Sequence, residues 1–76
     1  MTLDKVKQLV ATQLNKSVEN ITAESRLIED LGADSLDIME MLMVLEEEFN
    51  ITIMDEEVEQ MKTIAGVVKV VESKLG

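Results

Sequence analysis

The sequence predicts an all-α fold: a small four-helix bundle with three main helices, one short third helix and a long first loop. Apolar residues recur at the three- and four-residue spacing of helices, and no segment of useful length alternates in the manner of a strand. The chain has 76 residues and no proline. Because no linker is evident, we expect one domain, residues 1–76, which can bury only about 60% of its unfolded surface.

The first helix is expected from about residue 3 to residue 15, with Thr2 as its N-terminal cap. Its apolar stripe consists of Leu3, Val6, Leu9, Val10 and Leu14. A long connection follows, from Lys16 to Ala33, and it holds too many apolar residues for a fully solvated loop. We expect its apolar side chains to plug the core, namely Val18, Ile21, Leu27, Ile28 and Leu31.

The second helix is expected from Ser35 to Phe49, and its apolar side chains fall on two faces at about 100° per residue. The core face consists of Ile38, Met41, Leu42, Leu45 and Phe49. The opposite face holds Leu36, Met39 and Met43 beside acidic residues. We interpret it as a docking surface, because methionine adapts to partners of different shapes. The alternative is that another helix covers this face.

Two further helices complete the bundle. A short acidic turn from Asp55 to Met61, with Asp55 as its cap, should place Val58 and Met61 inward. It is too short to be stable without tertiary packing, so we expect it to be mobile. The last helix should begin after its cap, Thr63. Its stripe consists of Ile64, Val67, Val68, Val71 and Leu75.

The chain is strongly acidic, with a net charge of −9, and the acids concentrate in its middle. Between Glu24 and Glu59 the only basic residue is Arg26. Such a surface repels nucleic acid and attracts basic patches on proteins, so we expect no nucleic-acid partner. The alternative is that the acids only keep a small protein in solution.

Composition also excludes several kinds of chemistry. The chain has no cysteine and no histidine, so it has no thiolate metal site and no imidazole base, and we expect no enzyme. Asp30, Asp34 and Asp37 do not follow the spacing of a calcium loop, so no specific metal site is expected. With neither a leader segment nor a membrane span in the sequence, we expect a cytoplasmic monomer.

Ser35 is the most informative residue. Asp34 can cap the second helix, which leaves Ser35 at the first helical position with its hydroxyl free to face solvent. An anion there would gain from the helix N-terminus but would be opposed by Asp34, Asp37 and Glu40. A phosphate attached at Ser35 therefore calls for a partner that brings cations. The alternative is that Ser35 serves only to start the helix.

Several segments resemble the acyl carrier protein of dissociated (type II) fatty acid synthesis. They are Leu27-Ile28-Glu29-Asp30-Leu31, then Gly32-Ala33-Asp34-Ser35-Leu36-Asp37, then Leu45-Glu46-Glu47-Glu48-Phe49, and Asp55-Glu56-Glu57 leading to Thr63. The resemblance covers nearly the whole chain and implies that residues 1–76 form a single acyl-carrier domain. Met54 departs from it, because many members have proline there, and Ile38 occupies a position that is often polar.

The resemblance implies that Ser35 carries a 4′-phosphopantetheine arm, transferred from coenzyme A by a phosphopantetheinyl transferase that uses Mg²⁺. Acyl intermediates would travel as thioesters on the thiol of the arm and be delivered to fatty acid synthesis enzymes with basic patches. The implied recognition residues are Asp34, Leu36, Asp37, Met39, Glu40, Met43, Glu46, Glu47, Asp55 and Glu56. The candidates for lining an acyl pocket are Leu42, Leu45, Val58, Met61 and Val67.

Two alternatives stay open at this point. One is a carrier domain of a polyketide, peptide or aminoacyl pathway, which would share the arm and the bundle. The other is an acidic, non-catalytic adaptor protein that uses the methionine-lined face. A hydrolase is the weakest interpretation, because Ser35 has no visible base.

Overall fold

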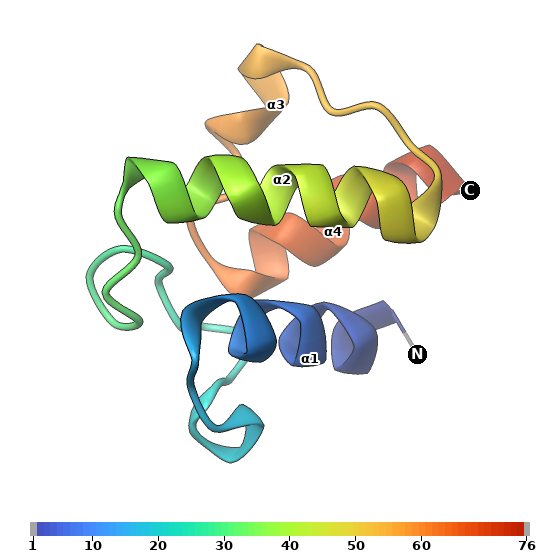
Figure 1. Cartoon of the computed structure of the whole chain (residues 1–76). Helices are drawn as coiled ribbons and strands as arrows, with labels where there is room; N and C mark the ends of the chain where they lie inside the picture. Colours follow the sequence, from blue (N-terminus) through green and yellow to red (C-terminus); the bar gives the residue numbers. More distant parts are fainter. Residues whose placement is uncertain (1, 76) are drawn as a thin grey trace.

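The computed structural model describes residues 2–75, and over that range the regular elements are all helical, as predicted. They are α1 (Thr2–Leu14), a short 3₁₀ turn η1 (Val18–Asn20), α2 (Ser35–Phe49), α3 (Asp55–Val58) and α4 (Ile64–Leu75). Helix α1 contacts both α2 and α4, while α3 lies on the other side of α2 from α1 (Figure 1). No helix among residues 2–75 has the length and apolar character required to cross a membrane.

The core lies where the three main helices meet, and it is formed by the apolar stripes that the spacing predicts. Its fully buried helical side chains are Val6, Val10, Leu45, Ile64, Val67 and Val71. Leu75, at the end of the α4 stripe, is exposed instead. Removal of these side chains from water is the main force that holds so short a chain together.

The first loop supplies part of the core, although not with all five predicted side chains. Ile21, Leu27 and Leu31 are buried, whereas Val18 and Ile28 are exposed. The N–H groups of Leu31 and Gly32 donate to the carbonyls of Arg26 and Ile28, which winds this segment into a helical turn. Residues four apart share one face of such a turn, so Leu27 and Leu31 point inward together and Ile28 points outward.

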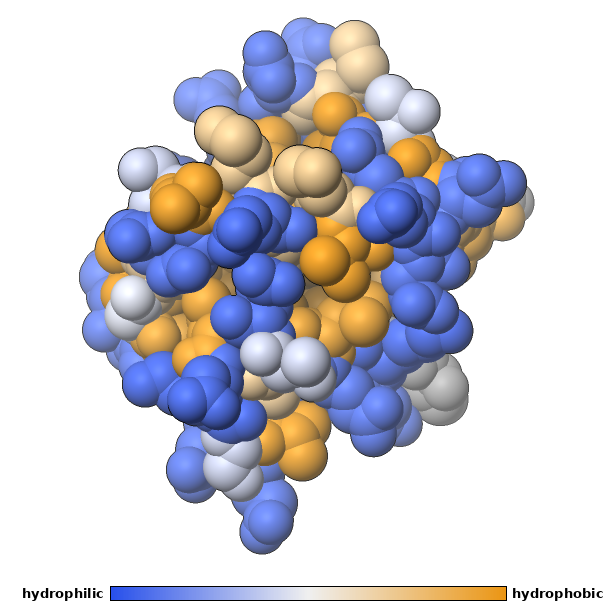
Figure 2. All heavy atoms as spheres, viewed as in Figure 1, coloured by the Kyte–Doolittle hydropathy of each residue, from blue (hydrophilic) through white to orange (hydrophobic). Residues whose placement is uncertain are grey.

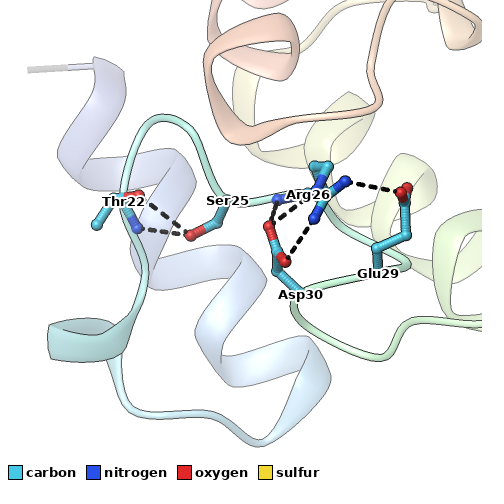
Figure 3. Close-up of polar contacts among 5 residues, drawn as sticks. All are labelled: Thr22, Ser25, Arg26, Glu29 and Asp30. Atoms are coloured by element: carbon cyan, nitrogen blue, oxygen red, sulfur yellow. Dashed lines mark hydrogen bonds and ion pairs between the residues drawn. The ribbon is translucent and has the colours of Figure 1, made fainter.

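The same loop is fastened to the start of α4 by backbone hydrogen bonds. The N–H of Leu27 donates to the carbonyl of Lys62 (3.0 Å), and the N–H of Ile64 donates to the carbonyl of Ser25 (3.0 Å). The Ser25 hydroxyl accepts the N–H of Thr22 at 2.9 Å (Figure 3). These bonds satisfy backbone groups that burial would otherwise leave unpaired.

Arg26 closes the outer side of this loop. Its backbone N–H donates to Asp30 Oδ2 at 2.8 Å, and its guanidinium donates to both Asp30 oxygens and to Glu29 Oε2 (Figure 3). These hydrogen bonds from Arg26 lower the pKa of the Asp30 carboxyl. The one cation in the acidic middle of the sequence is thus committed to the shape of the loop.

The capping predictions have mixed outcomes. Asp34 caps α2 and Thr63 caps α4, where the Thr63 hydroxyl accepts the N–H of Gly66 at 3.1 Å. Helix α1 already includes Thr2, so Thr2 does not precede it as a cap. Helix α3 is shorter than predicted, and Met54 rather than Asp55 is its N-cap residue. That α3 is mobile stays a prediction.

Glu57 explains how so short a helix is held. Its carboxylate accepts the N–H of Met54 at 2.8 Å and pairs with the ammonium of Lys74 in the last turn of α4 at 2.7 Å. The hydrogen bond from Lys74, followed by that from the Met54 backbone, lowers the pKa of Glu57. An acid at the third position of a helix therefore replaces the missing side-chain cap and links α3 to α4.

Gly66 marks a close approach between α4 and the segment that leaves α3. A Cβ atom at this position would collide with the backbone carbonyl oxygen of Gln60. Backbone cannot give way as the end of a flexible side chain can. Glycine therefore lets α4 lie directly against the α3–α4 connection.

We predict that Gly66→Ala destabilises the protein by about 1–3 kcal/mol, because the connection must shift to accommodate the methyl group. Inside a helix without such a neighbour, the same change stabilises by roughly 0.5–1 kcal/mol, so the sign of the effect is diagnostic. Urea denaturation of both proteins measures it. A higher denaturation midpoint for the variant would show that the connection moves away freely.

A second prediction concerns Glu57 and pH. Because its pKa is lowered in the folded state, the stability it contributes is present above the pKa of an unfolded-chain glutamate and is lost as pH falls through the folded value. Glu57→Gln should therefore melt below the parent near neutral pH, with the gap closing in acid. Thermal melts across pH measure this.

Glu56→Gln is the matched control, because it removes the same charge from the neighbouring, exposed position. Relief of acid crowding alone would leave the control unchanged or more stable than the parent at neutral pH. Equal melting temperatures for the two variants at every pH would contradict the role given to the Glu57–Lys74 pair.

Candidate functional site

Ser35 is the first residue of α2 and is exposed, as the sequence predicts. Asp34 Oδ1 accepts the N–H of Asp37 at 2.8 Å, while Asp37 Oδ2 accepts the N–H of Asp34 at 3.1 Å. This reciprocal capping box fixes the point at which the chain enters the helix. The Ser35 hydroxyl is therefore presented to solvent from a defined backbone position.

The surroundings of Ser35 suit attachment better than catalysis. The chain has no histidine, and the carboxylates of Asp34 and Asp37 already accept backbone N–H groups. Ser35 thus lacks the paired base that an activated serine nucleophile needs. The positive end of a 15-residue helix lies beside it and favours a negatively charged group at this position.

The predicted docking surface on α2 is exposed. We define it as Leu36, Met39 and Met43 with the flanking acids Glu40 and Glu47, and all five residues are solvent-exposed. Hydrophobic atoms lie between hydrophilic ones across the face that α2 occupies (Figure 2). No other described segment buries these side chains, so the alternative of a covering helix is wrong for residues 2–75. Their role in recognition stays a prediction.

The acidic recognition candidates differ in whether their carboxylates are already hydrogen-bonded within this chain. Asp55 and Glu56 are exposed at the start of α3. Glu40 accepts a hydrogen bond from the side-chain amide of Gln13 at 3.2 Å on the surface. Glu46 is half-buried, and its Oε2 accepts the N–H of Ile53 at 2.8 Å, so it holds the loop after α2 in place. Asp34 and Asp37 likewise serve the helix cap.

A cavity of about 360 Å³ opens between the first loop, the start of α2, and α3. It is lined by Leu27, Ile28, Glu29, Ile38, Asp55, Val58, Glu59, Met61 and Lys62. The lining includes Val58 and Met61 of the predicted pocket residues. The remaining three candidates lie elsewhere, because Leu45 and Val67 are fully buried in the core and Leu42 packs against it half-buried.

Sequence reasoning missed Leu27, Ile28 and Ile38 as lining residues. Ile38 follows Ser35 by three positions, so the two lie near one another along α2, and this spacing was the available signal. Leu27 and Ile28 belong to a loop whose fold the periodicity does not describe. The lining is not wholly apolar, since Glu29, Asp55, Glu59 and Lys62 share it with the apolar side chains.

Among the described residues, no cluster of three or more acidic side chains is positioned to hold a metal ion.

Comparisons with known proteins agree with this geometry. Residues 4–71 match the family described as "Phosphopantetheine attachment site". An acyl carrier protein of Wolinella succinogenes is 50% identical over 70 residues, which cover 92% of each chain. An acyl carrier protein of Helicobacter hepaticus is 49% identical over 72 residues, which cover 95% of each chain.

Solved structures with a similar fold belong to the same family. The solved structure of the acyl carrier protein from Enterococcus faecalis superposes with a TM-score of 0.80 at 30% identity, covering 96% of this chain and 92% of that chain. The acyl carrier protein from Thermotoga maritima gives a TM-score of 0.77 at 30% identity, covering 93% and 82%. The chain therefore belongs to the acyl carrier protein family, a family of non-catalytic carriers with a phosphopantetheine attachment site.

Proposed function

We propose that Ser35 is the residue that carries 4′-phosphopantetheine, and that the chain delivers acyl groups to the enzymes of fatty acid synthesis. The observation that supports this most directly is the exposed Ser35 hydroxyl at the first residue of α2, within the matched segment 4–71. Once bound, the arm supplies a thiol, which explains how a chain without cysteine handles acyl thioesters.

The residues around Ser35 determine how the arm is attached and held. In the transfer, the Ser35 hydroxyl loses its proton and its oxygen bonds to the phosphorus of the phosphopantetheine group. The P–O bond that joins this phosphorus to the rest of coenzyme A breaks, and adenosine 3′,5′-bisphosphate leaves. Among the described residues no base is hydrogen-bonded to Ser35 and no acidic cluster is positioned to hold a metal, so we expect the transferase to supply both the base and the Mg²⁺. The phosphodiester that results keeps a negative charge, which the N-terminus of α2 favours.

Docking of the transferase and of the synthesis enzymes is proposed to use the docking surface together with Asp55 and Glu56. The acids of the docking surface attract basic patches over a distance. Its apolar residues provide surface that becomes buried when a partner binds. Glu46, Asp34 and Asp37 already bond to this chain's own backbone. We therefore assign them mainly to shaping the surface, and Glu40 and Glu47 to contacting the partner.

The cavity is the proposed site for the acyl chain. It is open, largely apolar and within the size range of small-molecule sites, and α2 links its lining residue Ile38 to Ser35. The proposed lining is thus Leu27, Ile28, Ile38, Val58 and Met61. Leu45 and Val67 are fully buried core residues outside this lining, and their truncation would destabilise the fold.

We expect the parent protein to gain the mass of one phosphopantetheine when apo protein is incubated with coenzyme A, Mg²⁺ and a broad-specificity phosphopantetheinyl transferase. Ser35→Ala should gain none while keeping its helical circular dichroism, because the residue's side chain is exposed. Intact-protein mass spectrometry measures this. Loading of the alanine variant would place the arm elsewhere, and a folded parent that never loads would refute the carrier function.

Charge reversal tests the docking surface. Glu40→Lys/Glu47→Lys should weaken binding to a fatty acid synthesis enzyme by about tenfold, because both acids flank the apolar contact. The matched control is Glu19→Lys/Glu72→Lys, which makes the same change in net charge at exposed positions on η1 and α4. Titration calorimetry at two salt concentrations compares them. Equal losses for both variants would mean that only total charge matters.

A further inference from the structure

The five methionines within residues 2–75 divide into two groups by exposure. Met39 and Met43 on α2 are each 60% exposed, and Met54 before α3 is 52% exposed. Met41 and Met61 are 2% and 4% exposed. Thioether oxidation requires that an oxidant reach the sulfur, so the first group is susceptible and the second is protected by the core.

Met39 and Met43 have a defined relation to Ser35. The three residues are spaced by four along α2, so they lie along one side of the helix at steps of about 6 Å. A partner that reaches Ser35 and lies along α2 must cover both methionines. Leu36 is exposed beside them, so two of the three apolar side chains of the docking surface are methionines.

We propose that Met39 and Met43 form a reversible oxidation switch in the docking surface, with a peroxide as the oxidant. The inference rests on the proposed function, because it concerns the surface by which partners reach Ser35. In the reaction the thioether sulfur attacks one oxygen of hydrogen peroxide, the O–O bond breaks and an S–O bond forms. Sulfur loses two electrons, and the departing hydroxide takes a proton and leaves as water.

The product changes the surface without changing its charge. A sulfoxide is polar and accepts strong hydrogen bonds, so burying it against an apolar patch of a partner leaves it unpaired. The acids that attract partners over a distance are untouched, and the salt dependence of association should persist. The fold should also persist, because neither side chain is part of the core.

The test uses the full-length apo protein treated with hydrogen peroxide under native conditions. Digestion at glutamate and tandem mass spectrometry should find sulfoxide at Met39, Met43 and Met54 before Met41 and Met61. The kcat/KM for phosphopantetheine loading by the transferase should fall by about tenfold, with the same salt dependence and an unchanged thermal melt. A methionine sulfoxide reductase should restore it.

Variants assign the effect by comparing each protein before and after peroxide. For Met39→Leu/Met43→Leu, the kcat/KM for loading after peroxide should stay near its value before peroxide, because leucine cannot be oxidised in this way. This comparison holds whatever the kcat/KM of the untreated variant. For the matched control Met54→Leu the full tenfold loss should remain. Loss of the effect in the control, or its persistence in the double variant, would overturn the assignment to Met39 and Met43.

Two outcomes separate this inference from the proposed function. Untreated parent protein that never accepts phosphopantetheine would refute the carrier function and the switch together. Untreated parent protein that loads normally, and loads equally well with Met39 and Met43 oxidised, would refute the switch alone.

Discussion

The pairing of the first loop with the start of α4 is the constraint on which the rest of the molecule depends. Three backbone hydrogen bonds hold segments that are far apart in the sequence: Leu27 to Lys62, Ile64 to Ser25 and Ala65 to Ala23. They bring Leu27 and Met61 to one cavity and position the loop that leads to Asp34, the cap of α2. The position of Ser35 thus depends on the hydrogen bonds between the first loop and the start of α4.

Much of this architecture can be predicted from the sequence, and the limits have physical causes. The helical stripes and the caps Asp34 and Thr63 depend on local spacing, which the sequence displays directly. The exposure of Ser35 follows from them. Val18 and Ile28 were misplaced because apolar character does not reveal which way a side chain points in an irregular segment. The turn hydrogen bonds that orient Ile28, such as Gly32 to Ile28, are local, but an irregular turn follows no apolar spacing that the sequence displays.

The sequence likewise does not reveal which acidic residues bond within this chain. Glu46, Glu47 and Glu57 look alike in the sequence, but Glu46 holds the Ile53 backbone and Glu57 pairs with Lys74, while Glu47 is exposed. Only the tertiary structure separates acids that stabilise this chain from acids available to another. A high negative charge therefore has two roles here, and neither can be read from its total.

The cavity draws its walls from segments that are held in different ways. The first loop and α2 belong to the packed body of the molecule, whereas α3 has only four residues and is tied to α4 by the half-buried Glu57–Lys74 pair. An outward swing of α3 would enlarge the cavity while leaving the packing of α1 against α2 and α4 intact. One carrier could then hold bound groups of different sizes, because the cavity would enlarge only when a larger group enters. A small core would not need to keep a permanent void.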